Sequence, residues 1–154
     1  MIFVLIALSI FFLDYYVKKQ IELKKTIGVE EPLLGRRIIL RRTPNYGTAG
    51  GFCKKHTKLI CVLQGFSMVV LTLGYVKLLM VKGLAGLKLS GSWILGGGAS
   101  NLYDRLKKGY VTDYIRFEVP IKSIKRLVFN ISDFFILAGA FFGVILCIIS
   151  EMKK

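Results

Sequence analysis

Four aspartates are the residues of this chain whose type and position could support chemistry. Asp14, Asp104, Asp113 and Asp133 each lie at or near the edge of an apolar segment, whereas the five glutamates lie in the loops and the tail. A carboxylate at the centre of a membrane helix costs about 2.5–3.5 kcal/mol, so such residues usually have a function or a partner. Two carboxylates in one pocket hold a single proton between them, because both cannot ionise easily. The ionised member could then activate a water for peptide hydrolysis.

Structural roles would also explain these aspartates. Asn130 and Asp133 have the spacing of a capping box, and Asp14 could pair with Lys18 four residues further on. The segment Asn101-Leu102-Tyr103-Asp104-Arg105 could be a helix end with an adjacent ion pair. Spacing alone leaves both interpretations open, and it does not identify which two aspartates would form a catalytic pair.

Other catalytic classes find little support in the sequence. The single histidine, His56, lies in a basic segment without neighbouring histidines or cysteines, which disfavours a zinc site or a Ser–His pair. The three cysteines, Cys53, Cys61 and Cys147, are widely spaced and indicate neither a disulfide framework nor a metal site. The histidine and cysteine pattern therefore indicates no metal site.

The elements that must position the aspartates are long apolar runs. The chain has 154 residues, of which 54% are hydrophobic, and a net charge of +14. Apolar runs of up to about twenty residues alternate with basic stretches, and such a run spans a hydrocarbon core of roughly 30 Å. The sequence predicts one integral membrane domain over residues 1–154. Its all-α architecture would be a bundle of four transmembrane helices, at about 2–17, 59–80, 87–103 and 132–150.

Details of these runs predict how the helices pack. The first run has no basic leader and no cleavage site with small residues, so it is expected to stay as the first helix. The third is rich in glycine and serine, which favours a central position, and Gly139 and Gly143 form a packing face in the fourth. If successive helices are antiparallel, all four aspartates face the same side of the membrane.

The basic charge is concentrated in two polar segments. Residues 18–58 hold eleven lysines and arginines and residues 104–131 hold seven, which is eighteen of the 23 in the chain. Within the first segment, residues 36–42 are predicted to form a short strand, and the glycine-rich run 44–52 a turn or a loop of close approach.

Three motifs follow one another in the second half of the chain. They are Asn101-x-x-Asp104-Arg105, Val111-Thr112-Asp113 and Phe129-Asn130-Ile131-Ser132-Asp133. In this order they resemble the motifs of the signal peptidase II family, the bacterial lipoprotein signal peptidases. The resemblance is close from Gly96 to about Ile145. Upstream, Asp14-x-x-x-Lys18 and Asn45-Tyr46-Gly47 are similar to shorter family motifs. Two departures are a Phe at position 52, two residues late, and Ser132 in place of the family's Ala.

The resemblance implies a role for each matching residue. Asp113 and Asp133 fall on the two catalytic aspartates, and Asn101, Arg105 and Asn130 fall on polar positions that line them and orient substrate. Asp104 would be a supporting carboxylate paired with Arg105. The supporting positions that remain are Asp14, Lys18, Asn45 and Gly47. The polar segment 18–58 would form a small extracytoplasmic β-cradle inserted between the first two helices.

The implied activity is that of an intramembrane aspartic endopeptidase, for which the resemblance implies no metal and no organic cofactor. Its substrate would be a prolipoprotein whose lipobox cysteine carries diacylglyceryl, cut just before that cysteine. We expect a monomeric, multi-pass protein of the bacterial cytoplasmic (inner) membrane, with membrane lipid, including anionic lipid, as a further partner and no nucleic acid. Family topology puts both basic segments outside, whereas the positive-inside rule would put them in the cytoplasm. A folded cradle that overrides the rule, or contact with anionic lipid of the outer leaflet, would reconcile the two.

Two alternatives come from the same sequence. The altered glycine-rich loop is compatible with a divergent paralogue that cuts another membrane peptide. The net charge of +14 is compatible with a non-catalytic membrane protein that binds anionic lipid or an acidic partner through its basic segments.

Overall fold

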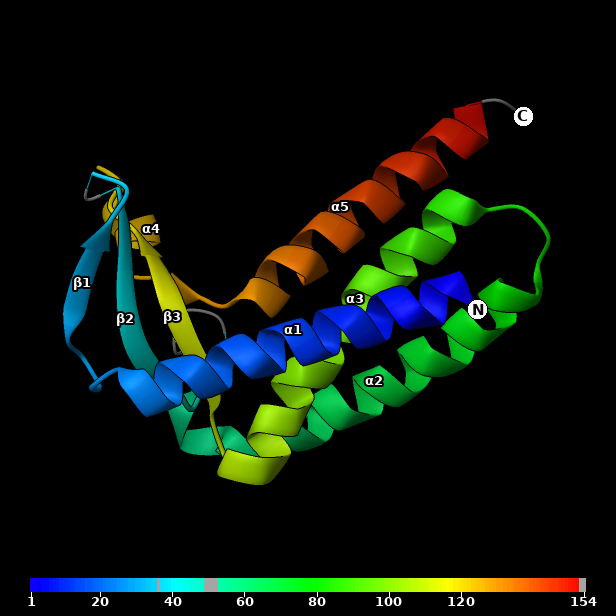
Figure 1. The fold of residues 1–154 in the computed structure, drawn as a ribbon. Coiled ribbons are helices and arrows are strands. Elements are labelled where there is room, and N and C mark those ends of the chain that lie inside the picture. The colour runs from blue at the N-terminus through cyan, green and yellow to red at the C-terminus, as the bar shows by residue number, and fades with distance from the viewer. Residues whose placement is uncertain (36, 49–52, 153–154) are drawn as a thin grey trace.

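The computed structural model describes residues 1–35, 37–48 and 53–152. Its elements, in chain order, are α1 (Ile2–Lys24), β1 (Glu30–Leu33), β2 (Ile38–Asn45), the short 3-10 helix η2 (Lys54–His56), α2 (Thr57–Met80), α3 (Ala85–Lys108), β3 (Val111–Phe117), α4 (Lys122–Lys125), β4 (Val128–Phe129) and α5 (Ile131–Met152). Figure 1 shows the long helices α1, α2, α3 and α5 gathered together, with the strands beyond the end where α1 finishes and α5 begins.

Long helices cover all four of the expected ranges, but two of them are longer than the sequence predicts. The first continues to Lys24, and the expected end at Lys18 and Lys19 is wrong. Lys18 does not end the helix because its charge is buried against Asp14, one turn earlier on the same face. The third continues to Lys108 and ends at Gly109, whose φ of 79° allows its N–H to bond the carbonyl oxygen of Arg105.

Helix α3 is central, as its small residues predict. It packs against α1, α2 and α5. A Cβ atom at Gly96 would lie 2.6 Å from the carbonyl oxygen of Ala7 in α1, and one at Gly97 would lie 2.7 Å from that of Ser132 in α5. At Gly139, on the predicted packing face of α5, a Cβ atom would lie 2.8 Å from the carbonyl oxygen of Ser90. Because glycine has no side chain, these positions allow the helix backbones to approach each other closely.

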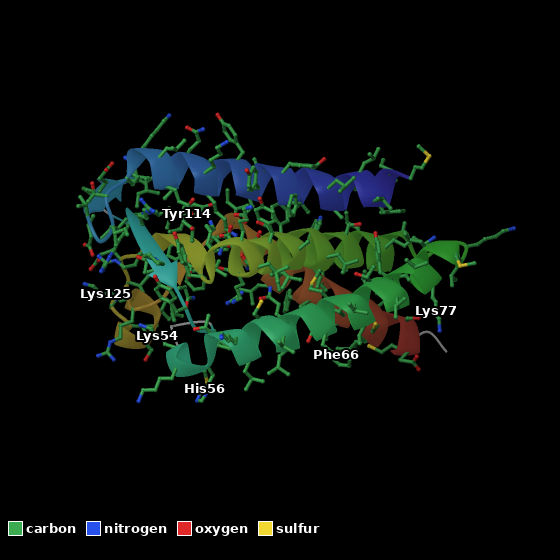
Figure 2. All side chains as sticks on the ribbon, turned by 90° about the horizontal axis from the view of Figure 1, so that it is seen from below. Lys54, His56, Phe66, Lys77, Tyr114 and Lys125 are labelled. Carbon is green, nitrogen blue, oxygen red and sulfur yellow. The ribbon has the colours of Figure 1, made fainter. Side chains whose placement is uncertain are left out.

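Within the part of the chain that the structure describes, two helices, α2 and α5, are long and apolar enough to cross a membrane. Large apolar side chains point outward from them, such as Phe66, which is 68% exposed, and Phe141, which is 71% exposed. Figure 2 shows Phe66 on the outer side of α2. Lipid hydrocarbon can cover such an apolar surface without a cost in free energy, whereas exposure of the same surface to water is unfavourable.

The polar segments form one antiparallel sheet in the order β1-β2-β3-β4. The expected cradle between the first two helices is therefore incomplete, because β3 and β4 come from residues 104–131. The expected strand over 36–42 is found as β2, shifted to 38–45, while Arg36 lies outside the described residues, as does Phe52. The register pairs Thr43 with Asp113 and Asn45 with Val111, which brings the end of β2 against the start of β3.

Candidate active site

Asp113 lies on β3 and is buried, with 3% of its surface exposed. Two side-chain amides bond its carboxylate. Asn45 Nδ2 donates to Oδ2 at 2.9 Å, and Asn130 Nδ2 donates to Oδ1 at 2.8 Å. The pairing of β2 with β3 places Asn45, and the short link between β4 and α5 places Asn130. Two parts of the chain, β2 and the link before α5, therefore hold this carboxylate of β3.

Asp133 lies in the first turn of α5 and closes a capping box with Asn130. The backbone N–H of Asn130 donates to Asp133 Oδ2 at 2.9 Å, and the N–H of Asp133 donates to Asn130 Oδ1 at 3.0 Å. Its other oxygen, Oδ1, accepts from Asn101 Nδ2 at 3.0 Å. The capping and site interpretations of Asp133 are thus compatible, because one oxygen caps the helix while the other faces the polar side chain of α3.

Asp113 and Asp133 share one cavity of about 230 Å³. The cavity has a polar end and an apolar wall, and its lining comprises Asn45, Asn101, Arg105, Val111, Asp113, Leu127, Val128, Phe129, Asp133, Ile136 and Leu137. Burial, together with the neighbouring charge of Asp133, raises the pKa of Asp113 from 3.8 to about 7. Asp113 can therefore be protonated near neutral pH while it stands beside a second carboxylate.

Arg105 reaches the same cavity from α3. Its Nη1 donates to Gln64 Oε1 of α2 at 2.6 Å, and its Nη2 donates to the carbonyl oxygen of Gly47 at 2.8 Å. Gln64 in turn donates from Nε2 to the carbonyl oxygen of Gly98 at 3.2 Å. Arg105 therefore ties α2 and the loop after β2 to the site. Gln64 was absent from the sequence-based set, although a lone amide within the apolar run of α2 could have marked it.

The expected ion pair between Asp104 and Arg105 is wrong. Asp104 pairs instead with Lys108 Nζ at 2.7 Å and with Lys18 Nζ at 3.4 Å. Its Oδ2 also accepts the backbone N–H of Thr112 at 3.1 Å, across the turn into β3. Neighbouring side chains on a helix point about 100° apart, so Asp104 faces α1 while Arg105 faces α2.

Asp14 and Lys18 form a buried polar network behind the cavity. Lys18 is 1% exposed, and its Nζ lies 2.7 Å from Asp14 Oδ2. It also donates to Asn101 Oδ1 at 2.8 Å and to Ser100 Oγ at 3.2 Å. The predicted pairing of Asp14 with Lys18 is confirmed. Since Asn101 also bonds Asp133, the network connects directly to the carboxylate pair.

Asp14 contacts the sequence neighbours of both cavity aspartates. Ser132 donates to Asp14 from its Oγ at 2.6 Å and from its N–H at 3.3 Å. The hydroxyl of Tyr114 donates to Asp14 Oδ1 at 3.4 Å, and burial raises the pKa of this tyrosine, which keeps it a donor. The hydroxyl that Ser132 adds thus bonds Asp14. Tyr114 and Ser100 were also absent from the sequence-based set, because their partners are far away in the chain.

All four aspartates therefore converge at one end of the helices, as the antiparallel order predicts. Across the ranges 1–35, 37–48 and 53–152, no group of three His, Cys, Asp or Glu side chains is placed to hold a metal ion. The lining of the cavity offers two carboxylates, two amides and one guanidinium beside an apolar wall, and the amide of a further residue, Asn130, bonds Asp113.

The fold is shared with solved bacterial membrane enzymes. One such structure superposes with a TM-score of 0.84 at 19% identity, and the match covers 99% of this chain and 90% of the other. A second has a TM-score of 0.77 at 22% identity, and that match covers 99% and 93% of the two chains. The chain thus has the helical fold of these enzymes, and its helices α2 and α5 are long and apolar enough to cross a membrane.

The sequence comparisons identify the family. The model of signal peptidase (SPase) II matches residues 6–150. The lipoprotein signal peptidase of Caldicellulosiruptor bescii is 34% identical over 140 residues, which are 90% of this chain and 85% of that protein. The lipoprotein signal peptidase of Halothermothrix orenii is 29% identical over 137 residues, or 88% of each chain. The chain belongs to the signal peptidase II family, and it is a membrane peptidase.

Proposed function

We propose that this chain is an aspartic endopeptidase that removes the signal peptide from diacylglyceryl-modified prolipoproteins before the lipobox cysteine, with Asp113 and Asp133 as its catalytic pair. The observation that carries the proposal is the shared cavity, in which both carboxylates lie beside an apolar wall. The named relatives act on lipoproteins, and the family match extends over nearly the whole chain.

The carboxylate pair would share one proton during hydrolysis. We expect Asp113 to hold it, because burial and the charge of Asp133 raise the pKa of Asp113 to about 7. The ionised carboxylate of Asp133 would accept a proton from a water, whose oxygen attacks the scissile carbonyl carbon. Asp113 would donate its proton to the carbonyl oxygen, which stabilises the tetrahedral intermediate. Asp133 would then give the proton that it accepted to the amide nitrogen, and Asp113 would take back a proton from the hydroxyl on the former carbonyl carbon. The C–N bond breaks, which releases an amine and a carboxylic acid and restores the pair.

The surrounding amides and Arg105 would act as positioning residues. Asn45 and Asn130 fix Asp113, and Asn101 with the backbone of Asn130 fixes Asp133. Arg105, held by Gln64 and the carbonyl of Gly47, would orient the peptide at the polar end of the cavity. The roles of Asp14, Lys18 and Asp104 would be supportive, since their network lies behind the pair.

The apolar wall suits a lipidated substrate. Phe129, Ile136 and Leu137 line the cavity beside Asp133, and Leu137 is 59% exposed on the outer face of α5. An acyl chain or the apolar end of a signal peptide could reach this wall from the bilayer without crossing a polar surface.

The proposed topology has four membrane spans within one domain, residues 1–154, as a monomer of the cytoplasmic membrane. Helices α1 and α3 would span beside α2 and α5, because α3 packs centrally and α1 exposes Leu5, Phe12 and Leu13. The sheet and the site would lie on the extracytoplasmic side. Lys54 and Lys125 lie at the end with the sheet, and Lys77 lies at the opposite end (Figure 2). This topology puts the basic end outside, against the positive-inside rule, so the folded sheet would override the rule.

The test is cleavage of a diacylglyceryl-modified precursor by purified protein in detergent. Wild type should release the signal peptide before the lipidated cysteine, and Asp113→Asn or Asp133→Asn should lose activity by on the order of 10²–10⁴-fold or more. An unlipidated precursor serves as the matched substrate control. Retained activity in either asparagine variant would contradict the assignment of the pair, and equal cleavage without lipid would favour the divergent paralogue.

A further inference from the structure

The cavity that holds the two aspartates continues into a second, more polar cavity. This second cavity has a volume of about 110 Å³ and is lined by Thr43, Pro44, Asn45, Lys54, Asp113, Arg126 and Val128. It shares Asn45, Asp113 and Val128 with the first cavity. A polypeptide bound against Asp113 in the first cavity would therefore pass beside Lys54 and Arg126 if it extended into the second cavity.

Lys54 and Arg126 are the two cations in the lining of this second cavity. Both are exposed, and within the described ranges neither side chain makes a hydrogen bond or an ion pair. Arg126 also lines an adjoining cavity, but the other three cations of that cavity are paired, because Glu30 pairs with Arg41 and Arg116, and Glu118 pairs with Arg116 and Lys125.

Two unpaired positive charges that line one small cavity repel each other. An anion between them would remove this repulsion and gain two favourable contacts. A cavity of about 110 Å³ has room for a group the size of a carboxylate rather than for a bulky headgroup. The ligand chemistry indicated by the residues is therefore a small anionic side chain.

We propose that Lys54 and Arg126 form a subsite that binds an acidic side chain of the precursor, within the first three residues after the lipidated cysteine. The inference rests on the proposed function and specifies the substrate class of the same site. An extended chain rises about 3.3 Å per residue, so only the residues next to the scissile bond can reach a cavity that adjoins Asp113.

The mature side of the cleaved bond is the side that fits. The signal peptide and the diacylglyceryl group are apolar, and the apolar wall of Phe129, Ile136 and Leu137 lies in the first cavity. The residues that follow the cysteine are the polar part of the precursor, and the second cavity is the polar one. A lipid headgroup is the less favoured occupant, because the cavity is continuous with the peptide site at Asp113.

The experiment compares precursors that differ in one charge. Glu, Gln or Lys is placed at the first, second or third residue after the lipidated cysteine, and kcat/KM is measured in neutral detergent at low salt. At one or more of these positions, wild type should cleave the Glu precursor about five-fold faster than the Gln precursor, as one or two partly exposed ion pairs would give. The Lys precursor should be the slowest.

Charge reversal provides the second measurement. Lys54→Glu and Arg126→Glu should each lower the ratio of kcat/KM for the Glu precursor over the Lys precursor, and the double variant should bring it below one. Using a ratio cancels any general loss of folded enzyme. Lys55→Glu is the matched control, because Lys55 lies next in η2, is exposed and lines neither cavity, so its ratio should equal that of wild type.

Three outcomes separate the inference from the proposed function. Equal kcat/KM for Glu, Gln and Lys at all three positions, with cleavage intact, would overturn the subsite and leave the function standing. If wild type cleaves none of the precursors, the proposed function itself is overturned. If added anionic lipid instead changes cleavage of all precursors equally, and the charge reversals abolish that effect, the cations bind headgroups and the subsite is refuted.

Discussion

Asp113 and Asp133 are held by different elements, a strand and a helix, and share a partner in Asn130. The side-chain amide of Asn130 bonds Asp113, while its backbone N–H and side-chain oxygen complete the cap with Asp133. A substitution at Asn130 would therefore disturb both carboxylates at once. At this scale the chemistry depends on protonation and on the buried charges behind the pair.

Proteolytic activity should fall as pH rises through about 7. Burial and the charge of Asp133 raise the pKa of Asp113 to about 7, so above that pH the pair loses the proton that it shares. The measurement is kcat/KM against pH with a lipidated precursor that has no titratable group near the cleaved bond. A profile that stays flat from pH 6 to 9 would contradict the assignment of the proton to Asp113.

The same pKa predicts a dependence of stability on pH. A raised pKa in the folded state contributes stability that is fully present below the unfolded value of 3.8 and is lost as pH rises through about 7. Asp113→Asn cannot titrate, so the difference in melting temperature between this variant and wild type should shift in favour of the variant from pH 4 to pH 8. A constant difference would show that the pKa of Asp113 is not raised.

Lys18→Met should destabilise the protein by roughly 3–5 kcal/mol. The change leaves Asp14 and Asp104 buried without the cation between them, which is the costly way to break a buried ion pair. Lys19→Met is the matched control, since Lys19 is its exposed neighbour in α1 and should change stability little. Thermal unfolding in detergent measures both, and similar melting temperatures would argue against the network.

At the scale of elements, close contacts of α3 decide where the site residues stand. Gly96 lies against α1 and Gly97 against α5, so the helix that carries Asn101 and Arg105 approaches both neighbours closely. The contact of Gly97 with Ser132 is next to Asp133 in the chain. The spacing of α3 and α5 therefore sets the distance that the hydrogen bond between Asn101 and Asp133 must span.

Gly97→Ala should lower both activity and stability, the latter by about 1–3 kcal/mol. The added Cβ would lie 2.7 Å from the backbone carbonyl oxygen of Ser132, so α5 must move away from α3. Gly74→Ala in α2 is the control, because a Cβ atom at this position would have no neighbour within 4 Å. Alanine also stabilises a helix by about 1 kcal/mol relative to glycine. Equal activity and melting temperature for Gly97→Ala and wild type would show that the contact does not fix α5.

For the whole molecule, one feature unites the fold. The sheet takes two strands from each polar segment, so residues more than sixty positions apart, such as Asn45 and Asp113, meet beside the membrane helices. This assembly places most basic residues at the end of the molecule that holds the site. Its orientation across the membrane therefore decides whether exported precursors can reach the aspartates.

Cys53 offers a measurement of that orientation. It is exposed and free, and it precedes Lys54 at the site end of the molecule. In a variant with Cys61→Ser and Cys147→Ser, a membrane-impermeant thiol reagent should label Cys53 from the extracytoplasmic side of intact cells after the outer barrier is made permeable. Labelling only after the cytoplasmic membrane is broken would invert the proposed topology. Activity of the variant serves as the folding control.

The sequence alone determined the membrane class, the four helices and the convergence of the aspartates. Apolar runs of the length of a bilayer must become helices, and alternating direction brings Asp14, Asp104, Asp113 and Asp133 to one side. The capping box of Asn130 and Asp133 and the pair of Asp14 with Lys18 were also predictable, because they are local contacts within one turn.

Only the tertiary structure decided which polar groups meet across the chain. The register of β2 against β3 places Asn45 beside Asp113, and the packing of α1 against α3 pairs Asp104 with Lys18 rather than with Arg105. Tertiary packing also buries Lys18 within α1, so the helix does not end at this residue. Such partners lie far apart in sequence, and their meeting depends on helix rotation and strand register, which hydrophobic patterns alone do not fix.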